Sequence, residues 1–397
     1  MTGPSTMIAD ATIADARSVS TLRSLSLDQV QAANSGHIGL PLGAAPILHT
    51  LYSRFLISDP GHPNWINRDR FVLSAGHGSA LLYATLHLAG YGIGLDDLRT
   101  FRQWSSITPG HPESGLAPGV DATTGPLGQG IANAVGMAIA ETMAAERLNT
   151  DAGTIIDHRT FVLVSDGDLM EGIALEATAL AGVLRLGKLI ALYDDNDVVI
   201  DGHASITHSA DAVCGSLREY GWDVSEQIDG NDVEALARAL QKAIDTTDKP
   251  SLIRVRTTIG FGSSFAGQPK IHSGALAEPE VRKIKDSFGS DFAEPFSVPA
   301  DVAESWEPFA QRGAEARVSW ESELARVHAR RPEIVAELRR WQDAAPVTEA
   351  QLRSAVDVLD EPEAARFTSA RVLGAVALSD SSIVGGAADL AMATMAY

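Results

Sequence analysis

Two short apolar runs, separated by a helical pattern, dominate the distribution of hydrophobic and polar residues along this chain. The first run, Phe161–Val164, ends in Asp166-Gly167, and a helical pattern follows over Leu169–Leu186. The second run, Leu189–Tyr193, ends in Asp194-Asp195-Asn196. Short apolar runs bounded by turn residues are typical of buried strands. The segment therefore predicts a strand–helix–strand unit with two parallel strands.

The same alternation continues through most of the chain. Further strands are expected at Phe71–Leu73, Trp222–Ile228 and Ser251–Ile259. Helices are expected at 13–32, 42–56, 80–89, 131–148, 213–220, 233–244, 305–344 and 363–377. Strands that alternate with helices predict an α/β fold, in which a mainly parallel sheet carries helices on both faces. A linker is expected at 343–347, and a short strand with a loop at 381–390.

Oxygen-bearing side chains follow both strands of the first unit. Ligands of parallel sheets bind at the carboxyl ends of the strands, so Asp166 and Asn196 are expected to meet there. A carboxylate and an amide oxygen, joined by a backbone carbonyl, suit a hard cation such as Mg²⁺ or Ca²⁺. Because Mg²⁺ usually shares its ligands with phosphate oxygens, the pattern suggests a cofactor or substrate that carries a diphosphate.

Histidines in separate loop-like segments form a second candidate set. His37, His77 and His111 each follow a glycine, and His272 lies in a Gly/Ser-rich segment. A single histidine is usually structural, but four at element boundaries favour a site that binds phosphate or hydroxyl groups and moves protons. The chain contains no HExxH or CxxC spacing, which makes a zinc site improbable.

Three further features have both structural and functional interpretations. Gly125–Gly130 precedes a helical pattern. This segment either forms a tight turn or lets the backbone approach a ligand closely. Glu171 either pairs with a helix dipole or faces the same crevice as Asp166. Arg366 begins the last helical region, where an arginine usually faces solvent. The residues alone leave these alternatives open.

Charge and composition narrow the class of protein. The 397 residues include 31 basic and 51 acidic side chains, a net charge of −20, which argues against nucleic acid or an anionic membrane as partner. No apolar run approaches the roughly 20 residues of a membrane span, and the first residues do not resemble a secretory signal. The single cysteine, Cys214, fits a reducing compartment, so a cytoplasmic location is expected.

Long motifs in a fixed order resemble the N-terminal part of transketolase, a thiamine-diphosphate enzyme. They are NSGH at 34–37, PNWINRDRFVLS at 63–74, GHGSALLY at 76–83, TPGHPE at 108–113, TTGPLGQGIANAVGMAIAE at 123–141, SDGDLMEG at 165–172, LGKLIALYDDN at 186–196, DKPSLIRVRTTIGFGS at 248–263 and GGAADL at 385–390. The resemblance covers nearly the whole chain. It implies a thiamine-diphosphate-binding fold, followed by the start of a second α/β domain.

The resemblance also implies roles for particular residues. The metal, Mg²⁺ or Ca²⁺, would be bound by Asp166, Asn196 and the backbone carbonyl of Val198. The other residues expected to contact thiamine diphosphate are His77, Gly125, Leu127, Gly167, Glu171, His272 and Asp389. His37 and His111 would bind the hydroxyls of the sugar, His272 could assist proton transfer, and Arg366 would bind the sugar phosphate. The implied reaction moves a two-carbon ketol unit from a ketose to an aldose.

Several positions depart from the family's usual residues. They are Ile38, Ala75, Ser165, the segment Gln268-Pro269-Lys270 and Ala393. A serine that binds the substrate phosphate is usual at the position of Ala393, so an unphosphorylated or unusual sugar stays open. A relative with another sugar pair, such as a dihydroxyacetone-synthase type or a biosynthetic transketolase, and a non-catalytic scaffold subunit are the alternatives.

The family continues beyond the matched region into a pyrimidine-binding domain with an activating glutamate. Residues 1–342 are therefore expected to form the diphosphate-binding domain, and 343–397 a linker and the first part of the pyrimidine-binding domain. The resemblance implies a split transketolase in which a second subunit supplies the remainder, as an α2β2 heterotetramer. A truncated form of a single-chain enzyme is the other interpretation.

Overall fold

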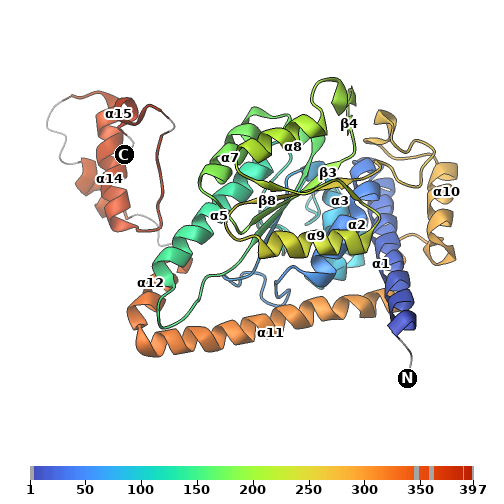
Figure 1. Ribbon diagram of the computed structural model, residues 1–397, viewed down its shortest axis with the longest axis horizontal. Coiled ribbons are helices and arrows are strands. Elements are labelled where there is room, and N and C mark those ends of the chain that lie inside the picture. Colours follow the sequence, from blue (N-terminus) through green and yellow to red (C-terminus); the bar gives the residue numbers. More distant parts are fainter. Residues whose placement is uncertain (1–3, 344–347, 357–361, 388, 396–397) are drawn as a thin grey trace. The chain divides into compact units, whose positions relative to one another are not determined.

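The computed structural model describes residues 4–343, 348–356, 362–387 and 389–395 (Figure 1). It divides into two compact units, Met1–Leu324 and Ala325–Tyr397, each of which is described by itself. None of the helices in the described ranges is long and apolar enough to cross a membrane. The candidate metal ligands Asp166 and Asn196 and the four candidate histidines all belong to the first unit.

A parallel sheet forms the centre of the first unit. Its strands are β1 (Arg70–Leu73), β2 (Thr160–Ser165), β3 (Leu189–Asp195), β6 (Asp223–Val224), β7 (Ile228–Asp229) and β8 (Ser251–Arg256). They lie in the order β1-β2-β3-β8, with β6 and β7 both paired to the outer edge of β8, and every pair is parallel. The predicted α/β class with a mainly parallel sheet is therefore confirmed.

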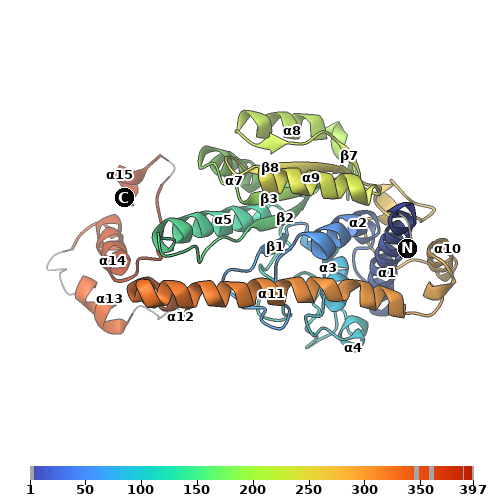
Figure 2. The same cartoon turned by 60° about the horizontal axis from the view of Figure 1, so that its bottom comes forward.

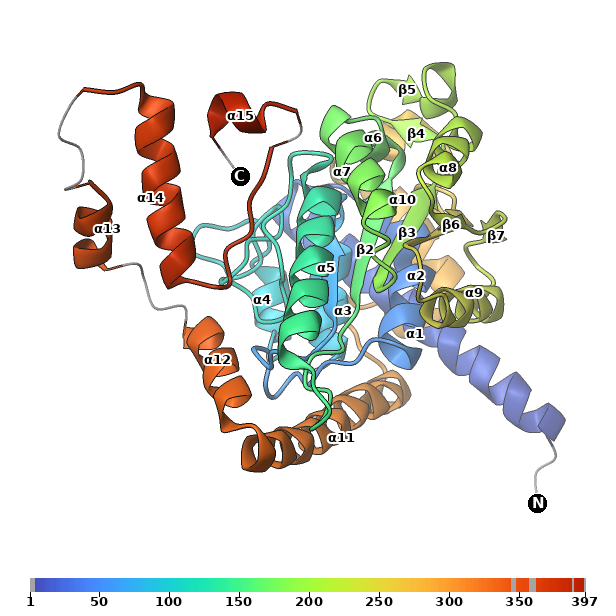
Figure 3. The same ribbon diagram turned by 60° about the vertical axis from the view of Figure 1, so that its left-hand side comes forward.

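Helices cover both faces of this sheet, as predicted. In chain order, the helices up to the end of the first unit are α1 (Pro4–Ala33), α2 (Gly39–Arg54), α3 (Ser79–Leu88), α4 (Leu95–Arg99), α5 (Gln129–Leu148), α6 (Asp166–Leu169), α7 (Gly172–Val183), α8 (Ala210–Glu219), α9 (Val233–Asp245), α10 (Glu278–Phe288) and α11 (Ala300–Arg330). Helices α5 and α7 lie side by side along the strands (Figures 1 and 3). Helices α1, α2 and α3 form a separate group (Figure 2).

Two hydrophobic clusters form the core, one on each face of the sheet. One contains Ile190 and Leu192 of β3 with buried side chains of α1, α2, α3 and α9. The other contains Ala191 and Tyr193 with buried side chains of α5, α7 and α8. Successive side chains of a strand point to opposite faces, which explains why neighbouring residues of β3 join different clusters. Because both faces are covered, β3 is buried along its whole length.

The helix that was expected to be continuous over Leu169–Leu186 is interrupted after β2. The chain forms the short α6, and α7 begins only at Gly172 because Glu171 is extended, with φ −74° and ψ 140°. The Asp168 carboxylate accepts a hydrogen bond from the Ser165 N–H at 3.3 Å, which closes the first turn after the strand. The break leaves a loop at the carboxyl end of β2.

Other element boundaries differ from the predicted ones. The strand expected over Trp222–Ile228 is split into β6 and β7, and β8 ends at Arg256 rather than Ile259. A two-residue antiparallel pair, β4 (Val198–Val199) with β5 (Gly202–His203), follows β3 and was not predicted. Its hairpin follows immediately after Asn196. The chain therefore turns back at the edge of the sheet where a ligand is expected.

The second unit contains the end of α11 together with α12 (Pro332–Asp343), α13 (Glu349–Val356), α14 (Ala365–Ser379) and α15 (Ala391–Thr394). The strand expected within 381–390 was a wrong prediction for the described residues of that range, which form turns and irregular chain. A strand needs a partner strand, and the described part of this unit contains none. The linker expected at 343–347 falls, apart from Asp343, outside the described residues.

Candidate functional site

A cavity of about 360 Å³ lies at the carboxyl ends of the central strands. Its walls come from the loops after β1, β2, β3 and β8 and from the segments before α2 and α5. The lining residues are His37, Leu40, His77, His111, Gly125, Leu127, Ser165, Gly167, Met170, Glu171, Asn196, Val198, Val199, Ile200, Asp201, Ile259 and His272. Most residues proposed from the sequence are therefore brought to one place in the first unit.

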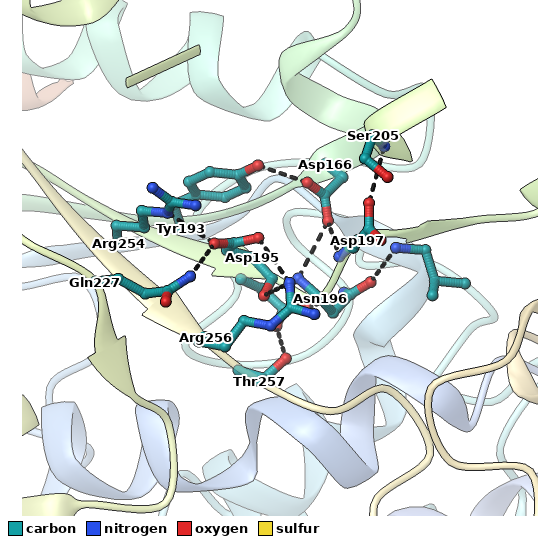
Figure 4. Close-up of polar contacts among 12 residues, drawn as sticks. Asp166, Tyr193, Asp195, Asn196, Asp197, Ser205, Gln227, Arg254, Arg256 and Thr257 are labelled. Carbon is teal, nitrogen blue, oxygen red and sulfur yellow. Dashed lines mark hydrogen bonds and ion pairs between the residues drawn. The ribbon is translucent and has the colours of Figure 1, made fainter. Parts of the chain in front are cut away.

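The loops after β2 and β3 are joined directly by Asp166. Its Oδ2 accepts hydrogen bonds from the main-chain N–H groups of Asn196, at 3.1 Å, and Asp197, at 2.8 Å (Figure 4). Asn196, which is 6% exposed, lines the cavity together with Val198, whereas Asp166 lies just behind the surface between the lining residues Ser165 and Gly167. The proposed carboxylate and amide ligands thus lie next to each other, as parallel strand ends require.

Buried negative charge accompanies this pair. Burial raises the pKa of Asp166 to about 6 and that of Asp194 to about 7. Nearby Asp195 is neutralised by Arg254, whose Nε lies 2.7 Å from Oδ2, and by Arg256 (Figure 4). Asp166 forms no such ion pair with the residues that the structure describes. A buried carboxylate without a cationic partner is a favourable ligand for a metal ion.

The chemistry of these donors can be compared with what a magnesium–diphosphate group needs. A carboxylate accepts about four hydrogen bonds or ligand contacts, and Asp166 uses three of them within the protein, leaving one for a cation. Among the described residues no three His, Cys, Asp or Glu side chains are grouped closely enough to hold a metal ion by themselves. A site with few protein ligands fits Mg²⁺, which takes its other ligands from water and phosphate. The residues present therefore fit the group.

Four histidines from four different loops form one cluster beside this pair. The His37 ring centroid lies 5.3 Å from that of His77, 6.0 Å from that of His111 and 5.5 Å from that of His272. His77 and His272 are stacked, with centroids 5.1 Å apart. Among the described residues, His37 Nδ1 and His272 Nδ1 are buried without a hydrogen-bond partner. Buried polar atoms are normally paired, so these two nitrogens favour a polar ligand in the cavity.

The surroundings keep these imidazoles neutral. Burial, followed by the charges of His272, His111 and Arg102, lowers the pKa of His37 to about 4. Burial holds the pKa of His77 well below its usual range, and it also lowers the pKa values of His111 and His272. A neutral imidazole offers one N–H donor and one acceptor nitrogen. At neutral pH the cluster can therefore both donate hydrogen bonds to oxygen atoms and accept them from hydroxyls.

The glycine-rich turn before α5 borders the cavity through Gly125 and Leu127. Gly128 has φ 78°, a left-handed conformation that favours glycine, and its N–H donates to Asp168 Oδ1 at 2.8 Å. A Cβ atom at Gly125 would lie 3.2 Å from Cγ of His111. The turn is thus held by Asp168 of the loop after β2, and Glu171, which is exposed, lies at the rim of the same cavity.

Arg366 and Asp389 are the two proposed site residues that lie outside the first unit. Both are exposed residues of the second unit, Arg366 on α14 and Asp389 before α15. Their proposed contacts with a sugar phosphate and with the cofactor thus stay predictions.

Some residues of the site were not identified from the sequence. Tyr193 donates a hydrogen bond to Asp166, Asp194 accepts one from Asn196, and Asp168 holds the turn before α5. Arg102 lies close enough to His37 and His111 to lower both pKa values. Buried acidic residues inside the motifs at 165–172 and 186–196 were a usable signal, because a buried carboxylate needs a partner. Arg102 carried no such signal.

Comparison with known proteins identifies the family to which this chain belongs. Residues 14–346 match the family model described as "Transketolase, thiamine diphosphate binding domain". The chain belongs to the transketolase family. It is 45% identical over 384 residues to the transketolase of Geobacillus stearothermophilus, an alignment that covers 94% of this chain and 56% of that protein. It is 44% identical to the chloroplastic transketolase of Spinacia oleracea, with 96% of this chain and 51% of that protein covered.

Solved transketolase structures share the fold. The complex of Pichia stipitis transketolase with sedoheptulose 7-phosphate superposes with a TM-score of 0.89 at 40% identity, covering 96% of this chain and 56% of that one. Transketolase from Leishmania mexicana gives a TM-score of 0.88 at 39% identity, with 96% and 57% covered. The chain thus spans about half the length of the transketolases that it matches. The predicted membership of the transketolase family is confirmed.

Proposed function

We propose that this chain is the diphosphate-binding part of a transketolase that transfers a two-carbon ketol unit from a ketose to an aldose. The observation that carries the proposal is the cavity in which four neutral histidines face the ends of β2 and β3. Hydroxyl-rich sugars and a diphosphate both need such donors and acceptors close together. The matching family model, which is named for thiamine diphosphate, supports the choice of cofactor.

The cofactor would be held from both sides of the cavity. Asp166, Asn196 and the backbone carbonyl of Val198 are the proposed ligands of Mg²⁺ or Ca²⁺, and His77 and His272 would contact the diphosphate oxygens. Gly125, Leu127 and Gly167 would line the cofactor, with Glu171 at the rim, and Asp389 is a further proposed cofactor contact. The cleavage of a carbon–carbon bond needs an electron sink, which thiamine diphosphate supplies when it is bound.

The protein's own part in the reaction is to orient the sugar and move protons. The ring centroids of His37 and His111 lie 6.0 Å apart, a spacing that suits two hydroxyls of one polyol. Because both pKa values are lowered, each ring is unprotonated at neutral pH and has a nitrogen free to accept a hydrogen bond from a substrate hydroxyl. His272, with its unpaired buried Nδ1, is the third candidate for proton transfer. These roles favour a polyhydroxylated ketose as the donor.

The phosphate end of the substrate is a finer part of the proposal. Pichia stipitis transketolases have been solved with sedoheptulose 7-phosphate and xylulose 5-phosphate, which are phosphorylated ketoses. Arg366 is the proposed phosphate ligand in this chain. Ala393 stands where the family usually has a serine, so we expect a weaker hold on the phosphate than in those relatives. Comparison of a phosphorylated ketose with its unphosphorylated form would measure that difference.

The proposed activity needs the other half of the relatives' length, and we propose that a second chain supplies it. Residues 1–342 would be the diphosphate-binding domain, and 343–397 a linker with the first part of the pyrimidine-binding domain. The complete enzyme would be a cytoplasmic α2β2 heterotetramer. The alignment covers 56% of the Geobacillus stearothermophilus transketolase, so that relative has a further part of comparable length. High turnover by the purified chain alone would contradict the need for a partner.

Cofactor binding can be tested on the purified chain by isothermal titration calorimetry. Thiamine diphosphate with Mg²⁺ is expected to bind, whereas thiamine, which lacks the diphosphate, is expected to bind far more weakly. Asp166→Asn is expected to weaken binding of the diphosphate form, because it removes the anionic ligand. Equal affinity for thiamine and thiamine diphosphate, or no effect of Asp166→Asn, would contradict the proposed site.

Catalysis is tested on the complex that co-purifies with the tagged chain from its own cells. Product analysis with a ketose donor and an aldose acceptor should show transfer of two carbons. His111→Ala is expected to lower kcat by about 100-fold or more, the usual scale for loss of an acid–base or hydroxyl-binding group. An unchanged rate in that variant would instead favour a cofactor-binding subunit without a catalytic role.

A further inference from the structure

Two consecutive residues of β3, Tyr193 and Asp194, each contact one of the proposed cation ligands. The Tyr193 hydroxyl donates to Oδ1 of Asp166 at 2.5 Å (Figure 4). The Asn196 Nδ2 group donates to Oδ2 of Asp194 at 2.7 Å. Both Tyr193 and Asp194 are fully buried, with 0% of each exposed. Neither lines the cavity, so they reach it only through Asp166 and Asn196.

The strand geometry explains how neighbours can serve different ligands. Side chains of successive strand residues point to opposite faces of the sheet. Tyr193 lies in the hydrophobic cluster that also contains residues of α5 and α7, on the side of the loop that follows β2. Asp194 therefore points to the other face, where the Thr257 hydroxyl beyond β8 donates to its Oδ1. The end of β3 thus places Tyr193 on one face of the sheet and Asp194 on the other, and each contacts one proposed cation ligand.

Asp194 determines which end of the Asn196 amide faces the cavity. A carboxylate oxygen accepts the Nδ2 hydrogen atom, while the Val198 N–H donates to Asn196 Oδ1 at 2.9 Å. A rotated amide would place its oxygen against the Asp194 oxygen and its NH₂ group against the Val198 N–H. Both hydrogen bonds are buried, and a buried polar group that loses its partner destabilises the arrangement. The oxygen end, the only end that can bind a cation, is therefore kept near Val198.

Tyr193 fixes the orientation of the Asp166 carboxylate in a similar way. Its hydroxyl fixes Oδ1, while the main-chain N–H groups of Asn196 and Asp197 fix Oδ2 (Figure 4). Three donors on two oxygens define the plane of the carboxylate. Groups that hydrogen-bond to metal ligands set the orientation of those ligands, and their loss typically lowers metal affinity about 10–100-fold.

We infer that Tyr193 and Asp194 are positioning residues of the divalent-cation site, which hold the carboxylate and the amide in the orientation that the cation requires. The inference rests on the proposed function, because it assumes that Asp166 and Asn196 are the ligands. It assigns two buried residues, neither of which touches substrate or cofactor, to the affinity for the metal. Thr257, whose hydroxyl donates to Asp194, helps to hold the Asp194 carboxylate in place.

Metal affinity provides the test, independently of turnover. Mn²⁺ is titrated into the purified chain with saturating thiamine diphosphate, and free Mn²⁺ is followed by electron paramagnetic resonance. Tyr193→Phe and Asp194→Asn are each expected to raise the Mn²⁺ dissociation constant about 10–100-fold. Thr257→Val, which leaves the Asp194–Asn196 contact in place, is expected to have a smaller effect. It also replaces Asp194→Asn in the test if that variant does not fold.

Matched controls separate orientation of the ligands from general destabilisation. Tyr91 is a buried tyrosine whose hydroxyl donates to Ser58 Oγ at 2.7 Å, and Asp69 is a buried aspartate that accepts from two main-chain N–H groups at the opposite edge of the sheet. Tyr91→Phe and Asp69→Asn should lower the melting temperature of the metal-free protein comparably. They should leave the Mn²⁺ dissociation constant unchanged.

The outcomes distinguish this inference from the proposed function. Absence of Mn²⁺ binding by the unmodified chain would overturn both. Binding that is lost in Asp166→Asn but is unchanged in Tyr193→Phe, Asp194→Asn and Thr257→Val would overturn only the inference. Equal losses in the Tyr193 and Tyr91 variants would also overturn it, because the effect would then follow stability. Selective loss in the variants of Tyr193, Asp194 and Thr257 would support it.

Discussion

Gly130, the second residue of α5, has no room for a side chain. A Cβ atom there would lie 2.4 Å from Cα of Ser74, whose hydroxyl accepts the N–H of Ile131 at 2.9 Å. Gly130→Ala is expected to lower the free energy of unfolding by about 1–3 kcal/mol or more, because backbone cannot move aside as a flexible side chain can. Urea unfolding of the purified chain would measure the loss.

Gly136 on the same helix is the matched control. It is exposed, and no atom lies within 4 Å of the position of its Cβ. Gly136→Ala is expected to stabilise the protein by about 0.5–1 kcal/mol through helix propensity alone. Changes of the same sign in both variants would show that the contact with Ser74 does not decide the effect at Gly130.

His158 gives the protein a predictable response to acid. It is 7% exposed, and burial, together with nearby Arg70, Lys188 and Arg68, lowers its pKa to about 3. An unfolded histidine has a pKa of about 6.5. Between these values the unfolded state holds a proton that the folded state lacks. The contribution of His158 to stability is thus complete above pH of about 6.5 and is lost as the pH falls toward about 3.

The prediction is tested by urea unfolding at several pH values for the unmodified protein and for His158→Gln. The stability of the unmodified protein should fall more steeply on acidification, by up to about 1.4 kcal/mol per pH unit, which is the effect of one proton. His328→Gln removes an exposed histidine of α11 and is the control for loss of a histidine as such. Parallel stability curves for the unmodified protein and His158→Gln would contradict the assignment.

At the scale of elements, Asp168 connects the loop after β2 to the turn before α5. Its carboxylate accepts from the N–H of Gly128 at 2.8 Å and from the N–H of Ser165 at 3.3 Å. Asp168→Asn keeps the shape but places an NH₂ group against one of these donors. The free energy of unfolding should fall by about 1–3 kcal/mol, the cost of an unpaired buried group. Thiamine diphosphate should also bind more weakly, because both loops border the cavity.

Asp69→Asn again serves as the control for the Asp168 prediction. Asp69 joins the segments before β1 and β2 through the N–H groups of Ile57 and Arg159, far from the carboxyl ends of the strands. The two variants should lose similar stability, measured by urea unfolding, but only Asp168→Asn should raise the dissociation constant measured by calorimetry. Equal cofactor affinity in both would mean that the turn keeps its position without Asp168.

Strands and helices differ in how well the sequence predicted them. Parallel strands β2 and β3 were predicted because each is buried on both faces and is therefore apolar throughout. The break between α6 and α7 was not predicted, because Leu169–Leu186 keeps a helical pattern across it. The strand expected within 381–390 did not form in the described residues, since a strand depends on a neighbour that a local pattern cannot supply.

For the molecule as a whole, the net charge of −20 implies self-repulsion in the folded state. Salt shortens the Debye length from about 30 Å at about 0.01 M to about 8 Å at about 0.15 M. The melting temperature of the purified chain, measured by differential scanning calorimetry, is expected to rise over this range. NaCl and KCl should act equally if screening is the cause. A constant or falling melting temperature would show that repulsion between like charges is not a significant cost.

The sequence by itself determined the α/β class, the parallel pair β2 and β3, and the meeting of Asp166 and Asn196 at one edge of the sheet. These features follow from hydrophobic periodicity and from the shared direction of parallel strands, both of which are encoded locally. Only the tertiary structure decided which partners lie behind those side chains. The His37–His272 cluster, the Tyr193–Asp166 bond and the Asp168–Gly128 bond join separate loops. Their geometry depends on strand register and helix packing, which no local pattern specifies.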